Sequence, residues 1–202
     1  MNLSDEARVV TRSRILAALG LGAAAVVVAG CGGTGPPVGA GSGGPGVGGY
    51  NFSRLTCSAP GSLPGRTVTV MLADAGMMSM MNGPAPMGAR MLLRAVPATV
   101  PAGQVSFVAE NVGWRTHELV VLPLQPGYAA GRRVSGSDGK VDESGSLGEA
   151  SASCAAGAGD GLASGTVGWI SVTLPPGRYE LVCNQPNHYI DGMRQELDVT
   201  SG

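Results

Sequence analysis

Charged side chains are scarce in this sequence: Asp, Glu, Lys and Arg make up 13% of its 202 residues. Proteins that bind the phosphate backbone of nucleic acids rely on clustered Lys and Arg, so this composition excludes a nucleic-acid binder of that kind. Phe, Trp and Tyr contribute only 4%, so aliphatic residues and methionine must supply most of the core. Histidine occurs twice, which limits the number of imidazole-based sites that the chain can build.

The first thirty residues have the pattern of a targeting segment rather than of a folded domain. Arg8, Arg12 and Arg14 precede an uncharged run over residues 15–30, which ends in V-A-G-C at Cys31. This order is typical of a signal peptide. The pattern resembles a bacterial lipobox, which implies cleavage before Cys31 and lipidation of its thiol. The alternative is an uncleaved membrane anchor, although the run is shorter than the ~20 residues that usually span a bilayer.

Glycine and proline dominate the segment that follows, residues 31–49, and indicate a flexible linker. We therefore expect three parts: a signal peptide (1–30), this linker, and a folded domain (50–202). The resulting protein would be a lipoprotein held at the extracytoplasmic face of the cell membrane. We expect it to be a monomer.

The folded domain is predicted to be all-β. Alternating or β-rich segments predict strands over residues 66–72, 89–96, 104–111, 117–122, 166–174, 178–183 and 193–200. Short strands separated by Gly and Pro turns favour an antiparallel β-sandwich. A Gly-, Ser- and Ala-rich insert over about 124–164 interrupts this pattern. It is either a surface excursion or a poorly ordered segment with one short helix.

Four cysteines must be assigned. Cys31 is the expected lipid site, and Cys183 lies in the motif described next. Cys57 and Cys154 remain, and in an exported protein two such cysteines favour a disulfide bond. The alternative is a pair of free thiols.

The segment C-N-Q-P-N-H-Y-I-D-G-M holds Cys183, His188 and Met193 at intervals of five residues. Two predicted strands flank it, so the segment must fold back on itself and can bring the three side chains together. His117 is the only other imidazole and is the candidate fourth ligand. Two His, one Cys and a weak axial Met form the blue-copper arrangement. Zinc is the competing metal, but thioether ligands favour copper, and a metal-free loop is the remaining alternative.

The same segment resembles the copper loop of cupredoxins, in particular the branch that includes rusticyanin and sulfocyanin. The run P-A-T-V-P-A-G-Q-V-S-F-V-A-E-N-V-G-W-R-T-H-E-L-V-V-L over residues 97–122 resembles the strand pair that delivers the first histidine. The resemblance covers residues 66–122 and 165–200 and implies a Greek-key β-sandwich with one copper ion on His117, Cys183, His188 and Met193.

Two positions depart from the family pattern. Relatives often have Pro-Gly before the second histidine, where this chain has Pro186-Asn187. Many place Asn after the first histidine, where it joins the two ligand loops, whereas this chain has Glu118. We therefore expect different hydrogen bonding around the thiolate and a different reduction potential.

The function implied is the transfer of single electrons between redox partner proteins. An alternative is a protein that binds and delivers copper, and a third is an anchored β-sandwich that binds no metal. A copper enzyme is not expected, because multicopper oxidases and copper nitrite reductases need further histidines.

Five of the nine methionines lie together in M-M-S-M-M-N-G-P-A-P-M: Met77, Met78, Met80, Met81 and Met87. Three interpretations remain open: a secondary copper(I) site, an adaptable surface for docking a redox partner, or a loop that covers the core.

Overall fold

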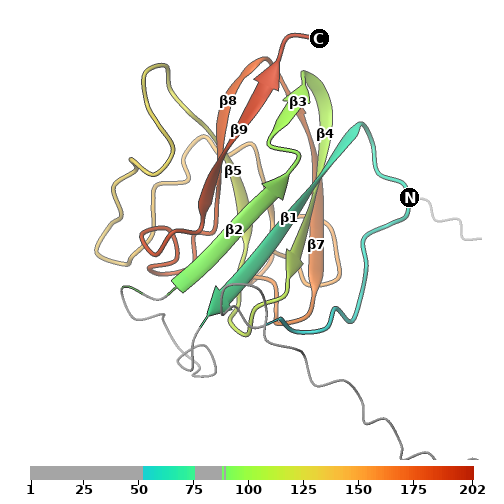
Figure 1. Ribbon diagram of the computed structural model, residues 1–202, viewed down its shortest axis with the longest axis vertical. Coiled ribbons are helices and arrows are strands. Elements are labelled where there is room, and N and C mark those ends of the chain that lie inside the picture. The colour runs from blue at the N-terminus through green and yellow to red at the C-terminus, as the bar shows by residue number, and fades with distance from the viewer. Residues whose placement is uncertain (1–51, 76–87, 89) are drawn as a thin grey trace, which may run out of the picture. The chain divides into compact units, whose positions relative to one another are not determined.

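The computed structural model of the protein describes residues 52–75, 88 and 90–202. In this part of the chain every regular element is a strand, and nine strands form two sheets (Figure 1). They are β1 (Arg66–Ala75), β2 (Arg90–Val96), β3 (Thr99–Pro101), β4 (Gly103–Asn111), β5 (Leu119–Pro123), β6 (Gly148–Ala150), β7 (Val167–Leu174), β8 (Gly177–Val182) and β9 (Arg194–Thr200). The all-β prediction is confirmed.

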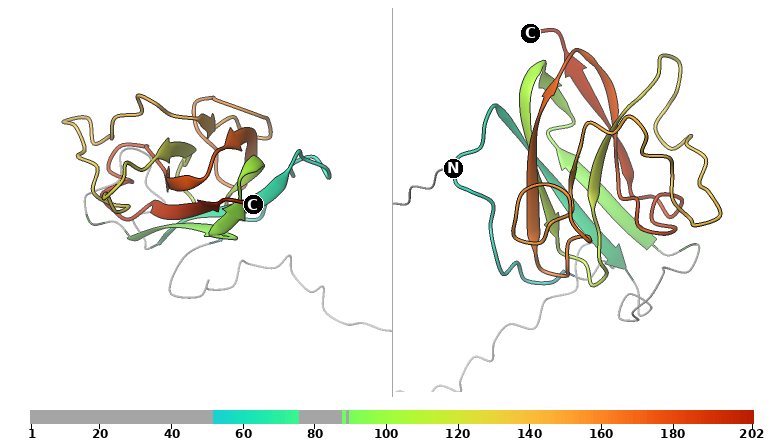
Figure 2. Two further views of the ribbon diagram at one scale, coloured as in Figure 1. Left: turned by 90° about the horizontal axis from the view of Figure 1, so that it is seen from above. Right: turned by 180° about the vertical axis from the view of Figure 1, so that it is seen from behind.

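The two sheets lie face to face as a sandwich, which Figure 2 shows end-on. One sheet has the order β2-β1-β4-β7 and the other the order β3-β9-β8-β5-β6. The predicted strand positions agree closely with those observed, but the strand expected from His117 begins at Leu119. His117 itself pairs outside the sheet, in an isolated bridge with Leu162.

The sandwich is mainly antiparallel, as predicted, with two exceptions among its strand pairs. β1 pairs with β4 in parallel, and β3 pairs with β9 in parallel. The reason lies in the connection: after β2 the chain crosses to the second sheet as β3, then returns to the first sheet as β4. Such a crossover allows parallel neighbours, whereas a tight hairpin joins only antiparallel ones.

The core between the sheets follows the alternation in the sequence. Val68, Val70 and Leu72 on β1 are fully buried, as are Val105 and Phe107 on β4. Aliphatic side chains supply most of this core, as the low aromatic content requires. Burial of these apolar surfaces is the main force that holds the two sheets together.

A second apolar cluster lies outside this main core, and part of the insert packs against it. Val120, Leu122 and Val182 pack with Val141 of the insert and with Tyr189 of the metal-binding segment. The continuous apolar run L-V-V-L in β5 is therefore buried on both faces. The insert contains no helix and contributes strand β6. It is a surface excursion in part only, because it covers this cluster.

Cys57 and Cys154 form a disulfide bond, which ties the segment before β1 to the insert. Cys31 and the five clustered methionines lie outside the described residues. Within residues 52–75, 88 and 90–202, no helix is long and apolar enough to cross a membrane.

Candidate metal centre

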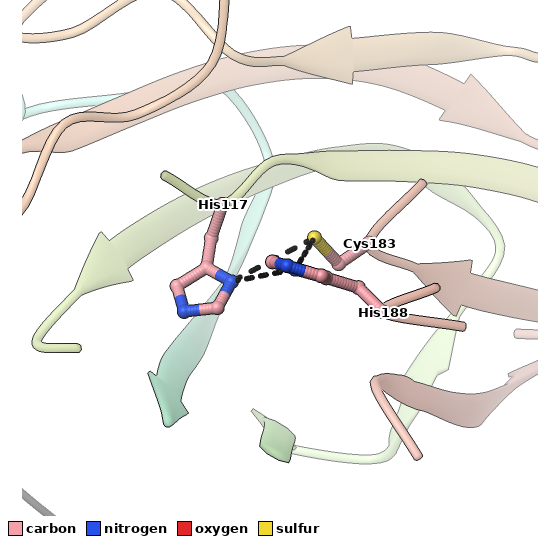
Figure 3. A group of neighbouring side chains, drawn as sticks. All are labelled: His117, Cys183 and His188. Carbon is pink, nitrogen blue, oxygen red and sulfur yellow. Dashed lines mark hydrogen bonds between the residues drawn. The ribbon is translucent and has the colours of Figure 1, made fainter. Parts of the chain in front are cut away.

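Three predicted ligand side chains converge at one end of the sandwich: His117, Cys183 and His188 (Figure 3). The Sγ atom of Cys183 lies 3.3 Å from Nδ1 of His188 and 3.8 Å from Nδ1 of His117. The two Nδ1 atoms are 3.1 Å apart. All three residues are buried, so their donor atoms face one another in a space largely closed to water.

The ligand loop, residues 183–193, is folded by its own backbone hydrogen bonds. The N–H of Cys183 donates to the carbonyl of Met193, and the N–H of Met193 donates to the carbonyl of His188, each at 3.0 Å. The loop thus closes on itself between β8 and β9, as the spacing of its residues predicted. These bonds place Met193 beside both loop ligands, and its side chain is fully buried in the main core next to Cys183.

Burial determines the charge state of the donor atoms in the metal-free protein. It lowers the pKa of His188 to about 3 and also lowers the pKa of His117, despite the opposing effect of a nearby Asp74. It raises the pKa of the Cys183 thiol. The imidazoles are therefore neutral and ready to bind a metal at neutral pH, and metal binding would displace the thiol proton.

This donor set fits a type 1 copper ion. Two neutral imidazole nitrogens and one sulfur meet without a carboxylate oxygen among them. A cation bound there would compensate for the cost of a buried thiolate. The adjacent buried thioether of Met193 favours copper over zinc.

Glu118, which follows His117, contacts the ligand loop with both its backbone and its side chain. Its backbone N–H donates to Sγ of Cys183 at 3.4 Å. Its carboxylate accepts a hydrogen bond of 2.6 Å from the side-chain amide of Gln185. The two ligand segments are therefore joined by a Glu118–Gln185 pair, and the departure from Asn does not remove the link.

Asn187 stands where relatives often have Gly, and its backbone adopts a conformation that Gly adopts readily. Its φ angle of 71° lies in the left-handed region, which Asn tolerates better than most residues. The backbone N–H of Asn187 donates to the carbonyl of Gly139 in the insert at 2.9 Å. Gly139 itself has φ +76, and a Cβ there would lie 2.5 Å from the Asn187 side-chain oxygen, so this contact requires glycine.

The insert holds the ligand loop at further points that the sequence did not predict. Asn184 accepts from the N–H of Val141 and donates to its carbonyl, at 2.7 and 2.9 Å. The Tyr189 hydroxyl accepts from the N–H of Arg133 and donates to the buried Glu180. Residues 131–141 of the insert therefore brace the loop on both sides of His188.

Two buried polar residues near His117 were also missed. Asn111 donates to the carbonyls of Arg115 and Leu162 and accepts from the N–H of Gly113, which shapes the turn before His117. Asp74 accepts a hydrogen bond from the ring of His117. The available signal for Asp74 was an acidic residue inside the apolar run V-M-L-A-D-A.

The β-sandwich thus carries a buried His₂Cys cluster together with Met193, a donor set suited to a type 1 copper ion. Solved structures similar to this chain include auracyanin B, at 20% identity over 75% of this chain and 98% of that chain, with a TM-score of 0.40. Reduced auracyanin from the photosynthetic bacterium Roseiflexus castenholzii is 22% identical over 50% of this chain and 82% of that chain, with a TM-score of 0.37. Rusticyanin from Thiobacillus ferrooxidans is 21% identical over 67% of this chain and 79% of that chain, with a TM-score of 0.34. No family model and no curated protein matches the chain.

Proposed function

We propose that this protein carries single electrons outside the cytoplasm, tethered to the membrane through a lipid on Cys31. The observation that carries the proposal is the buried convergence of His117, Cys183 and His188, in a loop that the insert holds on both sides of His188. Copper bound there supplies a one-electron redox couple. The protein holds the donor atoms in nearly fixed positions and excludes water, which limits the rearrangement that accompanies each electron transfer.

The bracing favours an electron carrier over a protein that delivers its copper to a partner. A delivery protein must release its ligands to a partner, whereas here both neighbours of His188 are tied to the insert. The chain has two histidines, and both lie in this cluster. No histidine remains for the additional copper ions of a copper enzyme, so we propose no catalytic role.

The Cys57–Cys154 disulfide supports the proposed location, because disulfides persist in oxidising compartments. The lipid on Cys31, the partner proteins and the monomeric state stay predictions. Incorporation of labelled fatty acid into the wild-type chain, but not into a Cys31→Ala variant, tests the anchor.

The absorption spectrum of the purified chain loaded with copper(II) tests the function. We expect an intense visible band from thiolate-to-copper charge transfer, bleached by a reductant and restored by an oxidant over repeated cycles. His117→Ala should remove or strongly shift this band. A colourless complex, or rapid loss of copper to a competing chelator, would favour copper delivery. Failure to bind copper would favour the metal-free sandwich.

A further inference from the structure

A buried carboxylate lies behind His117, on the side of the ring that faces away from Cys183 and His188. Asp74, near the end of β1, is 1% exposed, and its Oδ1 lies 3.0 Å from Nε2 of His117. Figure 3 shows that His117 turns its other ring nitrogen, Nδ1, toward Cys183 and His188. The ring therefore lies between a carboxylate on one side and the other two candidate ligands on the other.

Three N–H groups converge on the same oxygen of Asp74. The backbone N–H groups of Trp114 and Arg115 donate to Oδ1 at 2.8 and 3.1 Å, in addition to Nε2 of His117. When ionised, a carboxylate only accepts hydrogen bonds, so it suits three converging N–H donors. Two of these donors are backbone groups, so the position of Asp74 is set by the backbone rather than by the histidine.

Gly113 provides the space for this contact. A Cβ at this position would lie 2.1 Å from Oδ1 of Asp74 and 2.9 Å from Nε2 of His117. Any side chain there would push the carboxylate and the imidazole apart. The turn before His117 is thus built so that a buried charge reaches the outer nitrogen of a metal ligand.

We propose that Asp74 positions His117 and lowers the reduction potential of the bound copper. Its carboxylate keeps the proton on Nε2, which leaves the lone pair of Nδ1 directed at the metal site. Its negative charge stabilises the oxidised ion more than the reduced ion, because the oxidised ion carries one more positive charge. This inference rests on the proposed copper site.

The reduction potential of Asp74→Asn tests the charge. The amide has nearly the same shape as the carboxylate and can still accept a hydrogen bond, but it is neutral. We expect the ratio of reduced to oxidised copper at a fixed applied potential to rise about tenfold, which corresponds to about 59 mV for one electron. Asp198→Asn, which removes an exposed carboxylate from β9, is the matched control and should leave the ratio unchanged.

The nitrogen chemical shifts of His117 in the copper-free protein test the positioning separately. We expect protonated Nε2 and unprotonated Nδ1 in the wild-type chain, and loss of this preference in Asp74→Ala and in Gly113→Ala. If the Asp74 variants do not fold, Gly113→Ala still tests the contact, since it leaves the carboxylate in place.

The two tests also separate this inference from the proposed function. A chain that forms no type 1 copper site would overturn the proposed function, while the nitrogen shifts would still report on Asp74. A normal type 1 spectrum with equal potentials in the wild-type chain and in Asp74→Asn would overturn the role in setting the potential. A proton on Nδ1 of His117 in the wild-type chain would overturn the positioning role.

Discussion

Removal of the Arg133 side chain should weaken the brace that holds the ligand loop. The carboxylate of Glu180 on β8 is completely buried, and the Arg133 guanidinium donates to it at 2.8 Å. The same carboxylate accepts from the N–H of Gly131 and from the hydroxyl of Tyr189, the residue that follows His188. Arg133→Ala removes the cation and leaves a buried negative charge with two neutral donors.

The cost of this change follows from the burial of the pair. Breaking a buried ion pair by removing one partner typically costs about 3–5 kcal/mol. The Arg133 side chain is 26% exposed, so water reduces its contribution and we expect a loss of about 3 kcal/mol. At about 2–4 °C per kcal/mol for a domain of this size, the melting temperature should fall by about 6–12 °C.

Arg178→Ala, on the strand β8 that also carries Glu180, is the matched control. Arg178 pairs with Glu196, but the two side chains are 42% and 30% exposed, and such surface pairs contribute little to stability. Chemical denaturation of the copper-free chain compares the two variants. An equal loss for Arg133→Ala and Arg178→Ala would refute the view that the buried carboxylate of Glu180 depends on Arg133.

Hydrogen exchange links this stability change to the metal site. If the brace acts on the ligand loop, Arg133→Ala should accelerate exchange of the backbone amides of residues 187–193 more than those of the main core. Uniform acceleration across the sandwich would mean that the ion pair stabilises the fold as a whole and has no particular effect on the loop.

Three further changes test other contacts of the centre. Glu118→Ala should lower stability by about 1.5–3 kcal/mol, the usual worth of a hydrogen bond to a charged group, and denaturation of the copper-free chain measures it. Gly139→Ala should be more destabilising than Gly145→Ala in the same assay, because both glycines have positive φ but only a Cβ at Gly139 meets Asn187. Stability of the copper-free chain should fall as the pH drops from about 6.5 toward about 3, the folded pKa of His188, because the unfolded state takes up the proton first. Denaturation at pH 7 and pH 4 checks this, and a His188→Gln variant should show a weaker dependence.

The convergence of His117, Cys183 and His188 could be predicted from the sequence because the choice of residues was so narrow. With two histidines in the chain, a loop that brought Cys183, His188 and Met193 together left one candidate for the remaining imidazole. The alternation of apolar residues in β1 and β4 likewise located the core. Each of these predictions depends on the identity and spacing of side chains, which can be read directly from the sequence.

The brace could not be predicted because most of its contacts use the backbone. The carbonyl of Gly139 and the N–H groups of Arg133 and Val141 carry the bonds to the ligand loop. Backbone groups are present at every residue, so the amino-acid sequence does not indicate which of them form these hydrogen bonds. The Gly-, Ser- and Ala-rich composition of the insert therefore indicated a surface excursion, and its few buried apolar residues, such as Val141 and Leu162, were too scattered to indicate otherwise.

The parallel pairing of β1 with β4 could not be predicted from the sequence for a related reason. Side chains alternate between faces in parallel and antiparallel strands alike, so the pattern in V-T-V-M-L identifies a strand but not the direction of its neighbour. That direction depends on β3, a strand of three residues that joins the other sheet. Asp74 was missed with it, because only the packing of β1 beside the turn at Gly113 brings this carboxylate to His117.

The positions that depart from the family pattern keep the site rigid by other means. Glu118 reaches Gln185 with its carboxylate, so the two ligand segments stay joined. Asn187 adopts a left-handed conformation, and the insert fixes its backbone through Gly139. Each substitution has a partner in the segment that it contacts, and a site held at both ligand segments has little freedom to rearrange between oxidation states. The departure at Glu118 also changes the charge around the site, because it places a carboxylate near the sulfur of Cys183.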